Sequence, residues 1–177
     1  MVSRIDMGKD VFLGYGIPDN DECAELVGRA FGYDIYVEKE TSTYMTVWVY
    51  DRAMAIVKPD GIKIYRIVSM IELEKERGAW HVDLLKVDSS YKGKNLAVKI
   101  YGFILKKMDI TLMAGCAQSA GGRYVWNKMV KKSNITVYAK KSPYSKVFDF
   151  PKSGNRELVS NLFDLYDSDA EIFAVAG

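Results

Sequence analysis

The sequence predicts an α+β fold, with a mixed α/β sheet as its centre. Strand-like runs between residues 44 and 87 follow one another through tight turns, which makes them antiparallel neighbours. Residues 80–139 then alternate strand, helix, strand, helix and strand, and such crossovers are parallel and right-handed. A chain of 177 residues with 49% hydrophobic side chains suits one full core. We therefore expect a single domain over 1–177, with a core over about 10–140, an extension over 141–177, and helices on both faces of the sheet.

The N-terminal part is predicted to hold one helix and then three strands. In residues 21–31, Cys23, Leu26, Val27 and Ala30 recur at helical spacing, which predicts the helix. β-Branched and aromatic residues predict the strands, and Gly, Pro and Asp predict the turns. The strands are expected over 44–57, 62–73 and 80–87, with turns at Asp51–Arg52, at Pro59–Gly61 and over 74–78.

The C-terminal part is predicted to alternate helices and strands. Residues 95–107 place Leu96, Ile100 and Ile104 on one face, as an amphipathic helix requires. A second helix is expected over 120–132, with strands over 110–116, 135–139 and 171–176. A loop is expected over 142–155 and a short helix over 156–166.

The composition restricts the class of protein. No apolar run reaches the ~18 residues of a membrane span, so we expect no membrane contact. Cys23 and Cys116 are too few for a disulfide scaffold, and no Cys/His spacing suggests zinc. We expect a reduced, cytoplasmic protein without metal. His81 is the single histidine, which excludes sites that need two. The choice between monomer and homodimer stays open.

Charge is concentrated in one stretch of the chain. The net charge is +2, yet residues 86–152 hold 14 basic and 3 acidic side chains, a net charge of +11. A segment this basic predicts an anionic ligand, substrate or partner, nucleic acid among them. Solvated lysine-rich helix faces are an equal interpretation, because lysine is the default surface residue of helices.

The most informative stretch runs from Val87 to Val98. A strand-like run ends there, a basic turn with glycine follows, and a helix-like run begins at Asn95. The first N–H groups of a helix lack partners within it, and the helix dipole favours negative charge there. The sequence therefore predicts a phosphate-binding site at this turn, with Lys92 and Lys94 adding positive charge.

This strand, turn and helix resembles the acyl-coenzyme A site of the GNAT superfamily of N-acetyltransferases. The family motif is Gln/Arg-x-x-Gly-x-Gly/Ala at the start of a helix, and Lys92 to Ala97 align with it. Ala97 matches, Lys92 replaces the first residue conservatively, and Asn95 stands where the family has glycine. Since asparagine tolerates positive φ and caps helices, we expect the shape of the turn to survive.

The resemblance implies roles for the turn and for the strand before it. Backbone N–H groups bind the pyrophosphate of acetyl-coenzyme A or another acyl-coenzyme A, and the strand end pairs with the pantetheine arm. The strand over 110–116 then diverges and leaves a slot for the thioester. The cofactor-binding residues are therefore expected to be Leu85, Lys86, Val87, Lys92, Gly93, Lys94, Asn95, Leu96 and Ala97.

A second segment, residues 118–129, lies where the family carries Ala-x-x-x-Tyr-x-Lys-x-Gly. When Lys128 is aligned with the lysine of this motif, Trp126 stands in place of a tyrosine that often protonates the leaving thiolate. Tryptophan cannot do so, and we expect Tyr124, Ser119 or a water to act and Trp126 to pack in the core. The segment is also similar to small acetyltransferase-like proteins of bacteriophages, which implies the host cytoplasm as location.

A base for the attacking amine is expected on the strand over 80–87. His81 and Asp83 alternate onto one side of this strand and are the first candidates. Glu72 or Glu74 on the neighbouring strand is the alternative, acting through water. A lone histidine on a strand is also often structural.

The resemblance thus implies an enzyme that transfers an acyl group from coenzyme A directly to an amine. In the first interpretation the acceptor is a protein or small-molecule amine. In the second it is a nucleobase, because one branch of this fold modifies phage DNA adenines and the basic segment suits nucleic acid. In the third, the departures at Asn95 and Trp126 mark a GNAT-fold binder or inhibitor without chemistry. The acceptor pocket is expected between the first helix and the loop over 142–155.

Overall fold

The computed structural model describes residues 13–16, 24–114, 120–140, 148–149 and 171–177. These residues form ten strands, two α-helices and one short 3₁₀ helix. The strands are β1 (Tyr15–Gly16), β2 (Ala24–Ala30), β3 (Tyr33–Lys39), β4 (Tyr44–Val57), β5 (Lys63–Glu76), β6 (Ala79–Val87), β7 (Leu112–Met113), β8 (Ile135–Lys140), β9 (Phe148–Asp149) and β10 (Glu171–Ala176). The helices are η1 (Ser89–Tyr91), α1 (Leu96–Met108) and α2 (Ala120–Val130).

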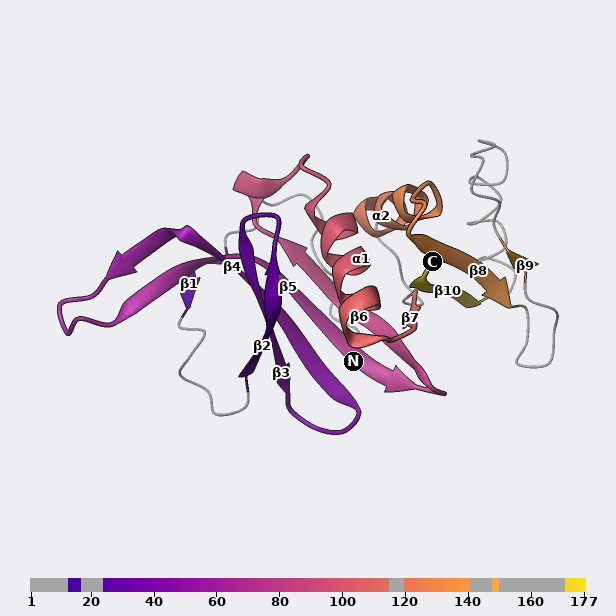
Figure 1. Cartoon of the computed structure of the whole chain (residues 1–177), viewed down its shortest axis with the longest axis horizontal. Coiled ribbons are helices and arrows are strands. Elements are labelled where there is room, and N and C mark those ends of the chain that lie inside the picture. Colours follow the sequence, from indigo (N-terminus) through magenta and orange to yellow (C-terminus); the bar gives the residue numbers. More distant parts are fainter. Residues whose placement is uncertain (1–12, 17–23, 115–119, 141–147, 150–170) are drawn as a thin grey trace.

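The described strands join into one mixed sheet in the order β2-β3-β4-β5-β6-β7-β10-β8-β9, with β1 paired to β5 (Figure 1). The pairings within it are antiparallel except that of β6 with β7, which are parallel and joined through α1. β10 lies between β7 and β8 and runs antiparallel to both. The predicted α+β class is confirmed, with antiparallel strands first and a parallel strand–helix–strand unit after them.

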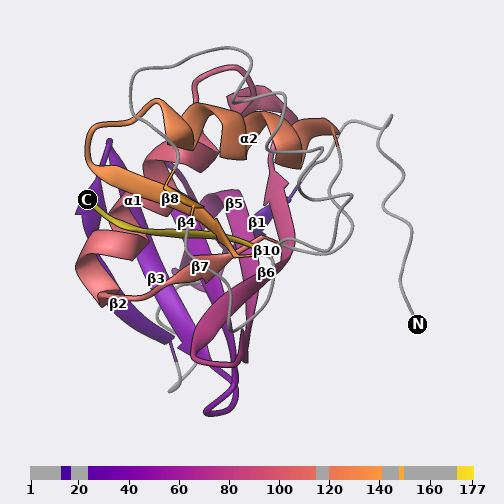
Figure 2. The ribbon, with the colours of Figure 1, turned by 90° about the vertical axis from the view of Figure 1, so that its right-hand side faces the viewer.

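The sheet curls around α1, and both described helices belong to one hydrophobic core (Figure 2). Ile100 and Ile104 of α1 are fully buried against the sheet, and Trp126 of α2 packs against Tyr101 with 6.4 Å between ring centroids. For the described residues, the expectation of helices on both faces is wrong. β7 and β8 run parallel, and two successive right-handed crossovers in one direction place their helices on the same face.

The helix predicted over 21–31 is also wrong, because residues 24–30 form the strand β2, which pairs with β3. A β-bulge between Leu26 and Gly28 inserts Val27 into the ladder. Val27 and Ala30 consequently both reach the core, although they are three residues apart. The bulge gives a strand the apolar spacing of a helix. The acceptor pocket was expected beside a helix at this place in the chain, and the β2–β3 hairpin stands there instead.

Most other predicted elements agree with the described ones. The strands over 62–73, 80–87, 135–139 and 171–176 and the helices over 95–107 and 120–132 are confirmed as β5, β6, β8, β10, α1 and α2. The hairpin turn at Pro59–Gly61 is confirmed. Of the strand predicted over 110–116, Leu112–Met113 is confirmed as β7, and residues 115–116 lie outside the described residues. Within the loop over 142–155, Phe148–Asp149 pairs with β8, and the helix over 156–166 lies outside the described residues.

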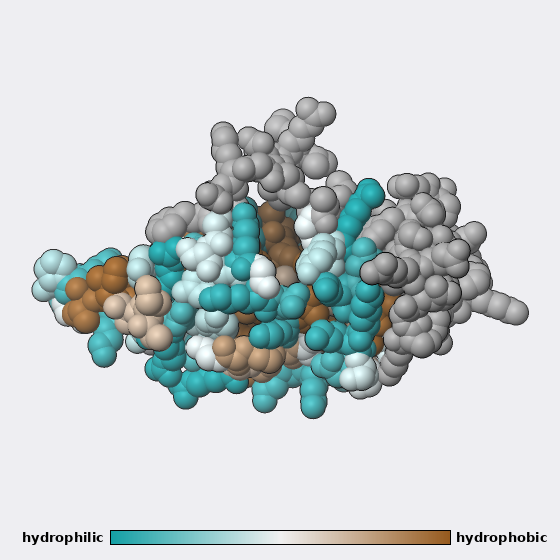
Figure 3. Space-filling model, turned by 90° about the horizontal axis from the view of Figure 1, so that it is seen from above, coloured by the Kyte–Doolittle hydropathy of each residue, from teal (hydrophilic) through white to brown (hydrophobic). Residues whose placement is uncertain are grey.

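Asp51–Arg52 does not reverse the chain as expected. β4 continues, and its register against β5 shifts between Asp51 and Ala55. Beyond this shift, residues 52–63 extend from the body as a two-stranded arm, at the left of Figure 1. All residues of the arm are exposed, and Figure 3 shows apolar surface at its end. The exposed apolar side chains of this arm are Met54, Ile56, Val57 and Ile62.

Candidate functional site

β6 and β7 diverge shortly after they meet. Their parallel pairing joins Trp80–His81 of β6 to Leu112–Met113 of β7. Ala114, which follows β7, donates its N–H to Ile172 of β10 instead, at 2.8 Å. Among the described residues, no strand therefore pairs with residues 83–87 of β6 on the side opposite β5.

A β-bulge at Asp83 determines which backbone groups of β6 face this opening. The register of β6 against β5 shifts by one residue there. Farther along, the Asp88 N–H donates to the carbonyl of Val68 on β5 at 3.0 Å. Since backbone groups alternate along a strand, the N–H and C=O groups of Leu85 and Val87 point away from β5. These two residues thus present their backbone to the opening.

Lys86 differs from its two neighbours. Its carbonyl accepts a hydrogen bond from the hydroxyl of Ser69 on β5 at 2.9 Å. The backbone of Lys86 is therefore turned into the sheet and away from the opening. Of the three strand residues expected to contact a cofactor, Lys86 has no backbone group placed to do so.

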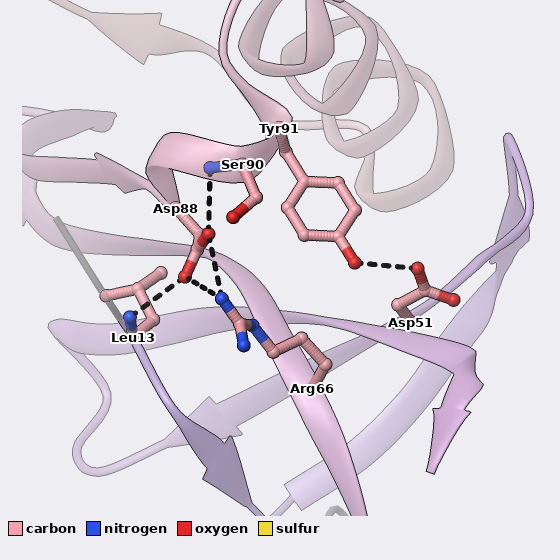
Figure 4. A network of polar contacts seen from close by, with 6 residues as sticks. All are labelled: Leu13, Asp51, Arg66, Asp88, Ser90 and Tyr91. Atoms are coloured by element: carbon pink, nitrogen blue, oxygen red, sulfur yellow. Dashed lines mark hydrogen bonds and ion pairs between the residues drawn. The ribbon is translucent and has the colours of Figure 1, made fainter. Parts of the chain in front are cut away.

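The turn after β6 is anchored by Asp88, whose surface is fully buried. Its carboxylate accepts hydrogen bonds from the N–H groups of Ser90 at 3.0 Å and Leu13 at 3.2 Å (Figure 4). Arg66 of β5 donates to both carboxylate oxygens, at 3.1 and 3.0 Å. Burial raises the pKa of Asp88, but these hydrogen bonds outweigh it and lower the pKa below its usual value. Asp88 stays ionised and fixes the turn.

Tyr91 holds the other side of the same turn. Its hydroxyl donates to Asp51 at 2.8 Å, and its ring meets the ring of Tyr33 edge-on at 6.0 Å. Burial, and then the neighbouring Asp51, raise the pKa of Tyr91, so its phenol stays protonated. The Nζ atom of Lys94 lies 5.2 Å from the centre of the Tyr91 ring. Tyr91 thus supports one of the two exposed lysines of the turn.

The basic turn, residues 92–95, has the backbone shape that the residue types predict. Gly93 has a φ of 80°, and Asn95 is left-handed with φ 53° and ψ 29°. The expectation that asparagine tolerates a positive φ at this turn is confirmed. Asn95 makes no side-chain cap hydrogen bond, and the first turn of α1 has no acidic residue. The N–H groups of Leu96 and Ala97 therefore begin a helix whose start is suited to an anion.

The candidate bases lie around the bulge of β6. His81 is half-buried opposite Glu74 of β5, whereas Asp83 is exposed at the bulge itself. The bulge breaks the alternation that was expected to bring these two residues onto one side. Burial, and then the nearby carboxylate of Glu72, raise the pKa of Tyr44 to about 12. The structure places these four candidates, His81, Asp83, Glu72 and Glu74, on the neighbouring strands β6 and β5.

The structure describes one of the two candidate acids of the second segment. Trp126 is 2% exposed and packs against Tyr101, which confirms its expected place in the core. Tyr124 is 54% exposed, and the Nζ atom of Lys128 lies 5.2 Å from its ring centre. Ser119 lies outside the described residues. Of the two candidate hydroxyl groups, the structure therefore describes that of Tyr124.

Sequence reasoning missed the Arg66–Asp88 pair and the bulge at Asp83. Asp88 precedes Ser89 and Ser90, a pattern typical of a residue that caps a turn, and this signal could have identified it. Arg66 lies 22 residues from Asp88, and no local pattern connects two such positions.

Among the described residues, no group of three or more His, Cys, Asp or Glu side chains is placed to hold a metal ion. Neither described helix combines the length and the apolar character that crossing a membrane requires. Comparison of the chain with protein-family models, with curated proteins and with solved structures finds no match.

Proposed function

We propose that this chain binds an acyl-coenzyme A and transfers the acyl group to an amine, as the GNAT resemblance implies. One arrangement carries the proposal. The edge of β6 that presents Leu85 and Val87 leads directly into the turn of Gly93 and Asn95 and the start of α1. An extended chain lying along this edge has its far end at a site suited to phosphate.

The residues present fit a long ligand with amides at one end and phosphates at the other. The backbone of Leu85 and Val87 offers the donors and acceptors that the pantetheine amides need. The start of α1 offers N–H groups with no acidic residue in the first turn. Lys92 and Lys94 are exposed and add positive charge at the same place.

The chemistry needs little beyond orientation and proton transfer. When bound, the thioester supplies an acyl group that an amine can attack directly. His81, Asp83, Glu72 or Glu74 accepts the proton of that amine, directly or through water. Tyr124, Ser119 or water supplies the proton that the departing thiolate takes up.

Calorimetric titration with acetyl-coenzyme A tests the proposal. The double variant Lys92→Gln/Lys94→Gln is expected to bind about tenfold more weakly than the unmodified chain, because it loses two charges beside the phosphates. The matched control is Lys106→Gln/Lys107→Gln, which removes the two lysines at the last turn of the same helix. The control is expected to keep the original affinity. The proposal fails if acetyl-coenzyme A neither binds nor stabilises the unmodified chain, or if both double variants lose affinity equally.

A second candidate function, binding without turnover, is favoured by the burial of Trp126. Its 2% exposure and its contact with Tyr101 make it a core residue where the family carries an acid. Mass spectrometry after incubation with acetyl-coenzyme A and protein, small-molecule and nucleobase amines separates the two functions. Acetylation of any acceptor excludes the binder, whereas tight binding with no acetylated product favours it.

A further inference from the structure

A hollow lies at the tip of the β2–β3 hairpin, on the side of the Tyr91 ring that meets Tyr33. Its volume is about 290 Å³, and Arg29, Phe31 and Arg52 are among the side chains that line it. None of these three belongs to the proposed coenzyme A site. The site inferred here is argued from these residues and goes beyond that function; of the three ligand sources named below, only the 3′-phosphoadenosine end of coenzyme A rests on the proposed function.

A buried carboxylate holds two arginines in this hollow. Asp34 is 4% exposed, and its two oxygens lie 3.1 Å from Nε of Arg29 and 3.0 Å from Nε of Arg52. The arginine side chains are themselves 63% and 50% exposed. A guanidinium carries five N–H donors, and among the described residues neither arginine has another hydrogen-bond partner. Two cations outweigh one anion, so the hollow is positively charged.

The turn adds an aromatic ring at an unusual backbone position. Phe31 and Gly32 form the two-residue connection between β2 and β3, with φ values of 58° and 86°. Asn, Asp or Gly usually occupies such positions, because a bulky residue is strained at positive φ. Phe31 is also 51% exposed, with the Nζ atom of Lys99 5.7 Å from its ring centre. A strained, exposed aromatic ring beside two arginines indicates a binding role, since neither feature stabilises the fold.

We propose that this hollow binds a nucleoside phosphomonoester, with the phosphate between Arg29 and Arg52 and the base stacked on Phe31. The exposed guanidinium donors match the oxygens of a doubly charged phosphate, and the buried Asp34 orients them in advance. A nucleobase has the flat face that an exposed aromatic ring stacks against. A free nucleotide, the 3′-phosphoadenosine end of coenzyme A and the phosphorylated end of a nucleic acid strand share this chemistry.

Titration of the ¹⁵N-labelled chain with AMP, followed by NMR, tests the site. The amide signal of Gly32 and the Nε–H signals of Arg29 and Arg52 are expected to shift in a saturable way. Adenosine and inorganic phosphate are each expected to bind at least about tenfold more weakly than AMP, because each makes half of the contacts. Arg29→Gln and Arg52→Gln are each expected to weaken AMP binding about tenfold.

Arg77→Gln is the matched control. Arg77 pairs with acidic side chains, as Arg29 and Arg52 do, and it precedes a glycine in a two-residue turn, as Phe31 does, but it lies outside the hollow. Its variant is expected to bind AMP as the unmodified chain does. The site is excluded if AMP leaves the Gly32, Arg29 and Arg52 signals unchanged, or if the variants at Arg29 and Arg52 bind AMP as the control does.

Phe31→Asn separates the role of the ring from folding. Asparagine suits a positive φ, so this variant is expected to melt at or above the original temperature. AMP is expected to lose its advantage over inorganic phosphate, because the base has no ring to stack on. An unchanged preference for AMP contradicts the proposed stacking.

Further ligands distinguish the three sources of the phosphate. Shifts with coenzyme A but not with dephospho-coenzyme A identify the 3′-phosphoadenosine end. Tighter binding of a 5′-phosphorylated trinucleotide than of its unphosphorylated form identifies a strand end. A response to AMP alone identifies a free nucleotide.

Discussion

At the scale of single residues, Asp88 holds the candidate coenzyme A site in place without facing it. The carboxylate is 0% exposed, and its partners Leu13 and Arg66 lie 75 and 22 residues away in the sequence. It also accepts a hydrogen bond from Ser90 at the start of η1. The position of the basic turn therefore depends on a buried charge beneath it.

Asp88→Asn is expected to lower the free energy of unfolding at neutral pH by about 3 kcal/mol, because Arg66 then lacks its counter-charge. The effect depends on pH. The folded pKa of Asp88 lies below its ordinary value of 3.8, so its contribution is present above that pH and is lost as the pH falls through the folded pKa. The difference between the two chains is therefore expected to shrink at about pH 2. Urea denaturation at both pH values measures it.

Asp60→Asn is a suitable control for this variant. Asp60 accepts a hydrogen bond from the N–H of Ile62 at 3.0 Å in an exposed turn, and an amide oxygen can accept the same bond. Little change in stability is expected at either pH. A loss for Asp88→Asn no larger than that of the control contradicts the anchoring role.

Residue types predicted the conformation of the basic turn but not what holds it. Asparagine is one of the few residues that tolerate a positive φ, so the local sequence was sufficient for Asn95. The partners of Asp88 come from β5 and from Leu13, and their meeting depends on the register of the sheet. A register of this kind is set by tertiary packing, which the local pattern does not encode.

At the scale of elements, β2 shows how a bulge can imitate a helix. Within residues 24–30, the apolar side chains that face the core follow helical spacing. The bulge at Val27 adds one residue to the two-residue repeat of a strand and so produces this spacing. The same bulge brings Gly28 close to α1, where a Cβ atom on Gly28 would lie 3.0 Å from the Phe103 ring. The absence of a side chain at Gly28 is therefore what lets β2 approach the helix.

Gly28→Val is expected to destabilise the chain by about 1–3 kcal/mol, although valine favours strands, because its side chain collides with Phe103. The variant Phe103→Ala makes room for it. In the Phe103→Ala chain, Gly28→Val is expected to lower the free energy of unfolding by at least about 1 kcal/mol less than it does in the unmodified chain. A double-mutant cycle of unfolding free energies measures this difference.

Gly102→Ala, in α1, is the contrasting control. Its Cβ atom would lie 3.4 Å from Ile135, an ordinary contact, and alanine stabilises a helix by about 0.5–1 kcal/mol relative to glycine. An equal loss for Gly28→Val with and without Phe103 would show that the ring is not the cause.

At the scale of the whole molecule, stability is expected to differ between the two halves of β4 and β5. Val47 and Val49 of β4 are fully buried beneath α1, whereas residues 52–63 of the arm are exposed throughout. A two-stranded hairpin without a core is marginally stable in water. The arm is therefore expected to open without unfolding the body.

Amide hydrogen exchange measures this difference within one strand. Amides of residues 53–57 are expected to open with free energies of about 2 kcal/mol or less, against values near the global stability for Val47 and Val49. Equal protection along the length of β4 contradicts a separate arm, and it would require a partner that covers Ile56 and Val57.

The overall order of the sheet was predictable only in part. The pairings of β4 with β5 and of β5 with β6 follow from short turns between consecutive runs, and the parallel pairing of β6 with β7 follows from one helical crossover. Residues 171–176 were recognisable as a strand. Their insertion between β7 and β8 joins segments far apart in the chain, and no turn signal reports such a pairing.

That insertion gives the molecule a fixed order of assembly during synthesis. A ribosome delivers β7, α2 and β8 before it reaches Glu171–Ala176, so the edges that β10 will cover stay unpaired until then. A nascent or prematurely ended chain that stops short of β10 carries two open strand edges and the uncovered residues of the core around Leu112 and Val137. We therefore expect this part of the sheet to complete its pairing only after residues 171–176 have been synthesised and have left the ribosome.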